Sequence, residues 1–233
     1  MPIIVPLWFY EFGSVMYFIA AFTGMLLTYF SFKLYNYTRK KSHLFLTLSF
    51  IFITIGFVIL TASNTYSHEH FEQCNPDCTI TNQQIFNTIV LGNYGYYVTS
   101  LIGYALFLFS YSMQDKKSRK KLFLQAAPPL VLSLFLRNQP LFVLYPFESI
   151  FFQPFQLISA ILLLLIVIRT YGNYKKSNTK LAALVPAGFG AILVYHVLMF
   201  SLPFSPLFFA FAHVSLLIGF GALLVMLIKV ERK

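Results

Sequence analysis

Seven long apolar stretches, joined by short segments that hold nearly all of the charge, run through this 233-residue chain. An α-helix needs about 20 apolar residues to cross the hydrocarbon core of a bilayer. Hydrophobic residues make up 58% of the chain and mean hydropathy is +0.72, more than a soluble domain of this length can bury. We therefore expect one all-α domain over 1–233, a bundle of seven transmembrane helices. The expected helices cover 9–32, 44–66, 86–112, 121–138, 147–169, 180–202 and 206–229.

The first stretch has neither a basic leader nor a small-residue cleavage site, so we expect a retained helix and not a signal peptide. Basic residues mark one side of the membrane. Of 17 Lys and Arg residues, all but Arg137 follow the first, third, fifth or seventh stretch. Because such residues collect on the cytoplasmic side, the N-terminus is expected outside and the C-terminus in the cytoplasm. Five acids are then expected on the outer side: Glu11, Glu69, Glu72, Asp77 and Glu148.

The net charge of +10 is explained by this topology and by anionic lipid, so no nucleic-acid partner is expected. The protein is expected in the cell membrane. It has no Ser-His-Asp set, glycine-rich phosphate loop or paired carboxylates, so the sequence does not favour an enzyme.

Two pairs of segments resemble one another. Residues 33–42 resemble 169–178 at an interval of 136, and residues 98–117 resemble 214–233 at an interval of 116. These pairings predict two parallel three-helix repeats, with a binding site at the interface of the halves. The expected parts are repeat 1 over about 9–117, a linker helix over about 121–138 and repeat 2 over about 147–233.

Two histidines stand out within the apolar stretches, where no Asp, Glu, Lys or Arg lies far from a helix end. Machines that move protons or cations normally keep acids there, so a proton pump is not expected. His196 and His213 each lie seven residues from a proline at the outer side. At 1.5 Å per residue, both should sit about 10 Å below the outer boundary, on antiparallel neighbouring helices. The second pairing sets Tyr97 at a similar level.

These positions predict a polar pocket that opens outward. Its expected members are His196, His213, Tyr97, Glu11, Glu148 and Gln156. Three uses of the histidines remain open: ties between helices, binding of a small molecule, or ligation of a metal or haem. Two histidines satisfy a haem but leave most metals under-coordinated.

The segment SHEHFEQCNPDC at 67–78 carries a second set of ligand types. Its candidate metal ligands are His68, His70, Cys74 and Cys78. The Cys-x3-Cys spacing differs from the Cys-x2-Cys pair of many zinc sites. On an oxidising outer face, a Cys74–Cys78 disulfide is favoured over a metal site.

The segment HVSLLIGFGALLV at 213–225 resembles the seventh helix of microbial rhodopsins. That family has an Asp counter-ion, then Val-Ser, then the retinal-linking Lys, then Gly-Phe-Gly. The matching positions here are His213, Val214, Ser215, Leu217, Gly219, Phe220 and Gly221. The resemblance implies seven helices with the N-terminus outside and a 3+1+3 repeat, and it sets the third-helix counter-ion position near Tyr97. Because Leu217 stands at the position of the retinal-linking lysine, this chain cannot form a retinal Schiff base there.

The sequence thus predicts an opsin-like receptor or sensor that binds a small molecule in an outward-facing pocket. Two alternatives are a facilitative transporter of a small neutral solute and a haem- or metal-binding membrane protein. The bilayer is an expected partner. The short cytoplasmic loops would also need a signalling partner in the membrane, or a second copy of the chain.

Overall fold

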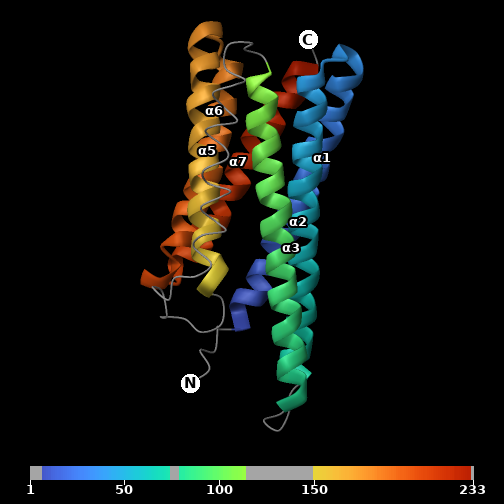
Figure 1. Cartoon of the computed structure of the whole chain (residues 1–233), viewed down its shortest axis with the longest axis vertical. Coiled ribbons are helices and arrows are strands. Elements are labelled where there is room, and N and C mark those ends of the chain that lie inside the picture. Colours follow the sequence, from blue (N-terminus) through green and yellow to red (C-terminus); the bar gives the residue numbers. More distant parts are fainter. Residues whose placement is uncertain (1–6, 74–78, 114–148, 232–233) are drawn as a thin grey trace.

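The computed structural model describes residues 7–73, 79–113 and 149–231. These residues are all-helical, without a strand (Figure 1). The helices are α1 (Leu7–Thr38), α2 (Lys41–Gln73), α3 (Thr79–Ser112), α5 (Ser149–Ser177), α6 (Lys180–Phe200), the short 3-10 helix η2 (Leu202–Phe204) and α7 (Leu207–Glu231). Helices α1, α2, α5, α6 and α7 are long and apolar enough to cross a membrane. The chain is therefore a multi-pass membrane protein.

The helices extend beyond the apolar stretches that predicted them. Helix α1 continues to Thr38, where 9–32 was expected, and α2 continues to Gln73. Polar residues at a helix end keep their backbone hydrogen bonds, so the end of the apolar stretch does not end the helix. Helix α3 covers the expected 86–112 but is not among the five membrane-spanning candidates. The expected helix over 121–138 lies outside the described residues.

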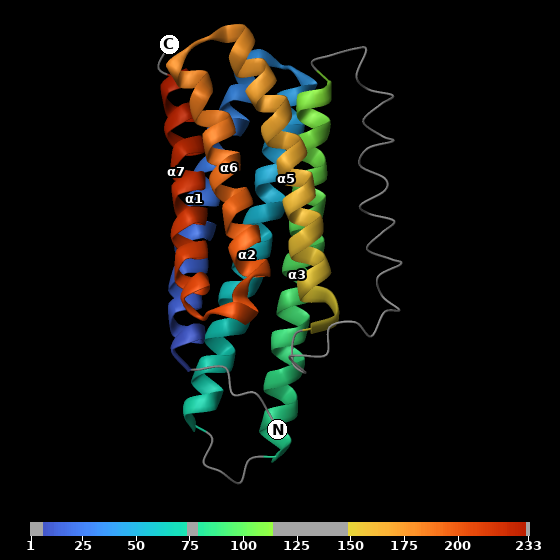
Figure 2. The ribbon, with the colours of Figure 1, turned by 90° about the vertical axis from the view of Figure 1, so that its left-hand side faces the viewer.

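The helices form two groups of three (Figures 1 and 2). In the first group α2 packs against α1 and α3, and in the second group α6 packs against α5 and α7. The groups meet where α1 contacts α7 and where α3 contacts α5. Helices α3 and α5 run in the same direction. The end of α3 and the start of α5 therefore lie at opposite ends of the bundle.

Small residues bring the helices of each group close together. A methyl group added at Gly92 of α3 would lie 2.2 Å from Ser63 Oγ of α2. One added at Gly219 of α7 would lie 2.7 Å from both the Gly188 carbonyl oxygen and Ile192 Cγ1 of α6. Only glycine allows such approach, which maximises the van der Waals contact that holds helices together in lipid.

The turn between α1 and α2 has the same build as the turn between α5 and α6. Arg39 and Asn178 both adopt the left-handed conformation, with φ of 53° and 47°. The Arg39 amide donates to the Tyr35 carbonyl at 2.7 Å, and the Asn178 amide donates to the Tyr174 carbonyl at 2.8 Å. The two turns recur at an interval of 139 residues. The pairing at 136 aligned the basic residues and so set this turn three residues, nearly one helical turn, out of register.

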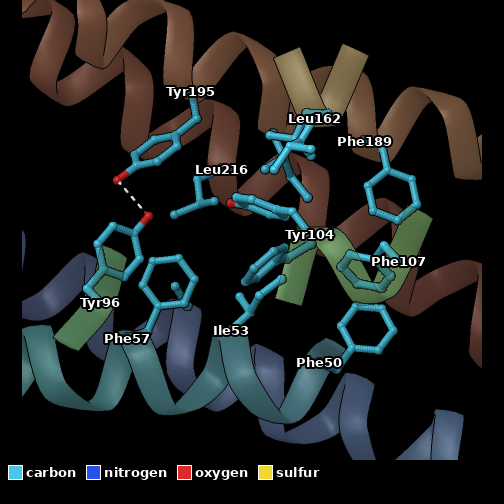
Figure 3. Packing of buried hydrophobic residues seen from close by; sticks show 14 of the residues in the cluster. Phe50, Ile53, Phe57, Tyr96, Tyr104, Phe107, Leu162, Phe189, Tyr195 and Leu216 are labelled. Atoms are coloured by element: carbon cyan, nitrogen blue, oxygen red, sulfur yellow. Dashed lines mark hydrogen bonds between the residues drawn. The ribbon is translucent and has the colours of Figure 1, made fainter. Parts of the chain in front are cut away.

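Core contacts recur at the same interval of 139 for the first two helices of each group, and at 116 for the third. An added methyl at Gly103 would lie 2.6 Å from Ile53 Cγ1, and one at Gly219 would lie 2.7 Å from Ile192 Cγ1. The ring of Phe107 packs edge-on against two phenylalanines 139 residues apart (Figure 3). Its centroid lies 4.9 Å from that of Phe50 and 5.0 Å from that of Phe189.

Candidate functional site

Three polar side chains from α3, α5 and α6 form a hydrogen-bonded chain, here called the triad: Tyr104, Gln156 and His196. Each is buried. His196 Nδ1 lies 2.6 Å from Gln156 Oε1, and His196 Nε2 lies 2.8 Å from the Tyr104 hydroxyl. Because an amide oxygen can only accept, Nδ1 carries the proton, and Nε2 accepts from Tyr104 O–H. The imidazole is thus neutral and both of its nitrogens are paired.

A second polar contact crosses the same boundary between the groups. The hydroxyl oxygens of Tyr96 on α3 and Tyr195 on α6 lie 3.5 Å apart (Figure 3). The Tyr195 ring also contacts both imidazoles, with centroids 4.9 Å from His196 and 5.8 Å from His213. Tyr195 is therefore in contact with both histidines.

His213 of α7 has a different environment from that of His196. Its Nδ1–H donates to the Phe209 carbonyl oxygen, one turn earlier in the same helix, at 2.7 Å. Its Nε2 has no hydrogen-bond partner within the described residues, although the side chain is fully buried. The ring lies among aromatic side chains of α1, α6 and α7.

The triad has an aromatic counterpart at the intervals of 139 and 116 residues. Phe57 stands 139 positions before His196, and Phe220 stands 116 positions after Tyr104. The Phe57 and Phe220 rings meet edge-on at 5.7 Å and 80°, and the His196 and Tyr104 rings meet edge-on at 5.5 Å and 85°. Tyr17 stands 139 positions before Gln156. Its ring stacks on that of Phe57, and in the equivalent place Gln156 is hydrogen-bonded to His196. Ring packing therefore holds the counterpart together, and hydrogen bonds hold the triad together; each set draws on both groups of helices.

No fixed charge lies within this region. The buried polar side chains of the described residues are Ser, Thr, Gln and His, with no Asp, Glu, Lys or Arg among them. A charge would be costly at this depth in a bilayer, whereas neutral groups are tolerated when they pair. The region is therefore built from neutral hydrogen-bonding groups.

The predicted pocket residues divide into two places. Gln156 and His196 are directly bonded, and Tyr97 joins them through Phe155, on which it stacks at 4.3 Å between centroids. The Phe155 ring lies 5.7 Å from that of His196. Glu11 does not reach this cluster, because the buried face of α1 carries Tyr17 and small residues instead.

The outward-facing opening expected around the histidines is closed, since both side chains have no exposed surface. Glu11 is exposed near the N-terminal end of α1, with Oε1 3.4 Å from His68 Nε2. The side chains of His70, Cys74, Cys78 and Glu148 lie outside the described residues, and the predicted disulfide with them. In the described part of the chain, no three His, Cys, Asp or Glu side chains gather as metal ligands.

A haem or metal shared by His196 and His213 would need an imidazole nitrogen from each at one centre. Both nitrogens of His196 are hydrogen-bonded, and Nδ1 of His213 is bonded to the Phe209 carbonyl oxygen. The side-chain arrangement does not fit such a centre. On α7 the buried face carries His213, Leu216 and Phe220, whereas Leu217 is only partly buried on its flank.

Sequence reasoning did not single out Tyr104 or Tyr195. One signal was present for Tyr104, since Tyr97, Tyr104 and Tyr111 recur every seven residues, which sets them on one helix face. Tyr195 precedes His196 directly and had no comparable pattern. Its importance follows from a contact between groups, which no local spacing reveals.

No protein-family model, curated protein or solved structure matches the chain.

Proposed function

We propose that the chain is an opsin-like seven-helix receptor or sensor, with the N-terminus outside, the C-terminus in the cytoplasm and a small-molecule site between its two groups of helices. The directions of α3 and α5 support a seventh crossing. Because these helices run parallel, the end of α3 and the start of α5 lie at opposite ends of the bundle. A helix over 121–138, as expected from the sequence, would be long enough to connect those two ends.

The observation that carries the proposal is the contrast between the triad and its counterpart. Tyr17 of α1, Phe57 of α2 and Phe220 of α7 fill the equivalent position with packed rings. The pair of Phe57 and Phe220 shows that an edge-on contact of this geometry needs no polar atom. The buried polar groups of the triad therefore support a role in recognition, because polar groups inside membrane bundles are commonly functional.

A ligand would act by competing for hydrogen bonds that now join the groups. The bond from Tyr104 to His196 connects α3 with α6, and the contact of Tyr96 with Tyr195 does the same. A molecule that pairs with one side of either bond favours a different arrangement of the two groups. It shifts the population by as much as its affinities for the two arrangements differ.

The test uses the full chain in lipid nanodiscs, with spin labels at Asn36 and Asn173. These exposed positions lie near the ends of α1 and α5, in different groups. Distance distributions are measured with and without glycerol, acetamide or urea, neutral solutes that both donate and accept hydrogen bonds. We expect at least one solute to shift the distribution in the wild-type chain.

The matched control is the triple variant Tyr104→Phe, Gln156→Leu, His196→Phe, which removes the three polar groups and leaves the labels in place. It should show no shift with any of the solutes. An equal shift in the triple variant, or none in the wild-type chain, contradicts a receptor site at the triad.

A facilitative transporter is the second candidate, favoured by the polar contacts at the meeting of two recurring halves. Parallel repeats with a site at their interface are a common plan for transporters. Uptake of the same three solutes into proteoliposomes distinguishes the functions. A transporter accelerates uptake beyond protein-free liposomes and loses this in the triple variant, whereas a sensor shows the distance change without uptake.

A further inference from the structure

His213 presents an unused hydrogen-bond acceptor in the interior of the bundle. Its Nδ1–H is committed to the Phe209 carbonyl, which fixes the neutral tautomer with the lone pair on Nε2. That atom is buried and has no partner within the described part of the chain. A buried acceptor without a donor costs free energy, because its hydrogen bond to water is lost and not replaced. A donor that reached Nε2 would recover that energy.

Aromatic rings surround the imidazole. Measured between ring centroids, Phe209 lies at 4.3 Å, Tyr17 at 4.9 Å, and Phe12 and Tyr195 at 5.8 Å. These four rings, here called the cage, come from α7, α1 and α6. The cage therefore spans the contact of α1 with α7. Such walls favour a flat apolar or aromatic body and disfavour an ion.

We propose that the cage binds a small neutral molecule with a compact aromatic or apolar body and one O–H or N–H group, which donates to His213 Nε2. The inference rests on the proposed receptor function and adds the chemical class of its ligand. It assigns recognition of the donor to His213, whereas the triad couples the two groups of helices. An ordered water at Nε2 is the competing occupant.

Phenol is the probe, and toluene is its matched control, with a similar ring but no donor. Full-length protein labelled with ¹⁵N-histidine is examined in nanodiscs, where an unprotonated ring nitrogen shifts when it accepts a hydrogen bond. We expect phenol to shift the His213 Nε2 resonance saturably and toluene to leave it unchanged. We also expect phenol to bind at least tenfold more weakly to His213→Phe, with toluene binding unaltered.

Three results would overturn the inference: the same effect from phenol and toluene, unchanged phenol binding in His213→Phe, or a resonance already shifted without probe and insensitive to phenol. The last identifies water as the occupant. If His213→Phe fails to fold, the response of the wild-type His213 Nε2 resonance to phenol and toluene still tests whether the donor binds there. Phenol binding at His213 without any change in the spin-label distances would uphold this site and reject the receptor function. Failure of the site and failure of the receptor function are therefore distinguishable.

Discussion

His196 illustrates how a polar side chain becomes tolerable in hydrocarbon. It donates through one ring nitrogen and accepts through the other, and its partners Gln156 and Tyr104 are equally buried. Interhelical hydrogen bonds of this kind stabilise membrane bundles by roughly 0.6–2 kcal/mol each. Removal of one partner costs more than the bond itself, because the remaining groups stay buried and unpaired.

The single variant His196→Phe should therefore be less stable than the triple variant, although it changes fewer residues. In the single variant the Tyr104 hydroxyl and the Gln156 amide both lose their partner, at a cost of about 1–3 kcal/mol each. In the triple variant no polar group remains, and the packed rings of Phe57 and Phe220 show that this geometry accepts apolar side chains. Thermal unfolding in detergent measures the order. A triple variant no more stable than His196→Phe would contradict it.

At the same scale, the sequence predicted the site only in part. His196, His213 and Gln156 were found because polar residues are rare in apolar stretches. Their partners were not, because Tyr104 lies 92 positions from His196 and meets it across the boundary between groups. Glu11 was grouped with them by its expected depth alone, although its side chain is exposed on the surface of α1.

At the scale of helices, α6 and α7 are locked by contact between two glycines. A methyl group at Gly219 would lie 2.7 Å from the Gly188 carbonyl oxygen, whereas one at Gly221 would meet nothing within 4 Å. Gly219→Ala should therefore destabilise the protein by about 1–3 kcal/mol through overpacking. Gly221→Ala should be neutral or up to about 1 kcal/mol more stable, since alanine favours the helix. Thermal unfolding of the pair measures this, and equal values would refute the close packing.

Helix positions were predictable for a simple reason: an apolar stretch of sufficient length has few alternatives in a bilayer. Helix ends were less so, because α1 and α2 continue through polar residues. The turns recur at an interval of 139 residues, three more than the interval at which the basic segments pair. The register of these turns is fixed by the left-handed residues Arg39 and Asn178, and a positive φ outside glycine leaves no clear mark in sequence.

At the scale of the whole molecule, the distribution of basic residues predicts which loops face the cytoplasm. Cysteines are introduced singly at Phe204, in η2 between α6 and α7, and at Asn178, in the turn between α5 and α6, with Cys74 and Cys78 replaced by Ser. A membrane-impermeant maleimide should label intact cells at position 204 and not at 178, and should label both after permeabilisation. The reverse pattern would overturn the orientation.

The two-group architecture was only partly visible in sequence. Apolar helices with basic ends resemble one another for reasons of topology, so similarity between segments is weak support for a repeat. Recurrence of the turn, the glycine contacts and the edge-on ring pairs is more informative, because each depends on three-dimensional geometry. Residues 114–148, which carry the expected linker helix, fall outside the described structure.

Helix α3 has a consequence for how the protein is made. It carries Asn93, Tyr96, Thr99 and Ser100 along its middle, and it is not among the helices apolar enough to cross alone. Its close contact with α2, through Gly92 against Ser63, offers those groups a protein surface in place of lipid. The translocation machinery should therefore release α2 and α3 into the bilayer together, as one hairpin, and a ribosome-bound chain that ends within α3 should remain at the channel.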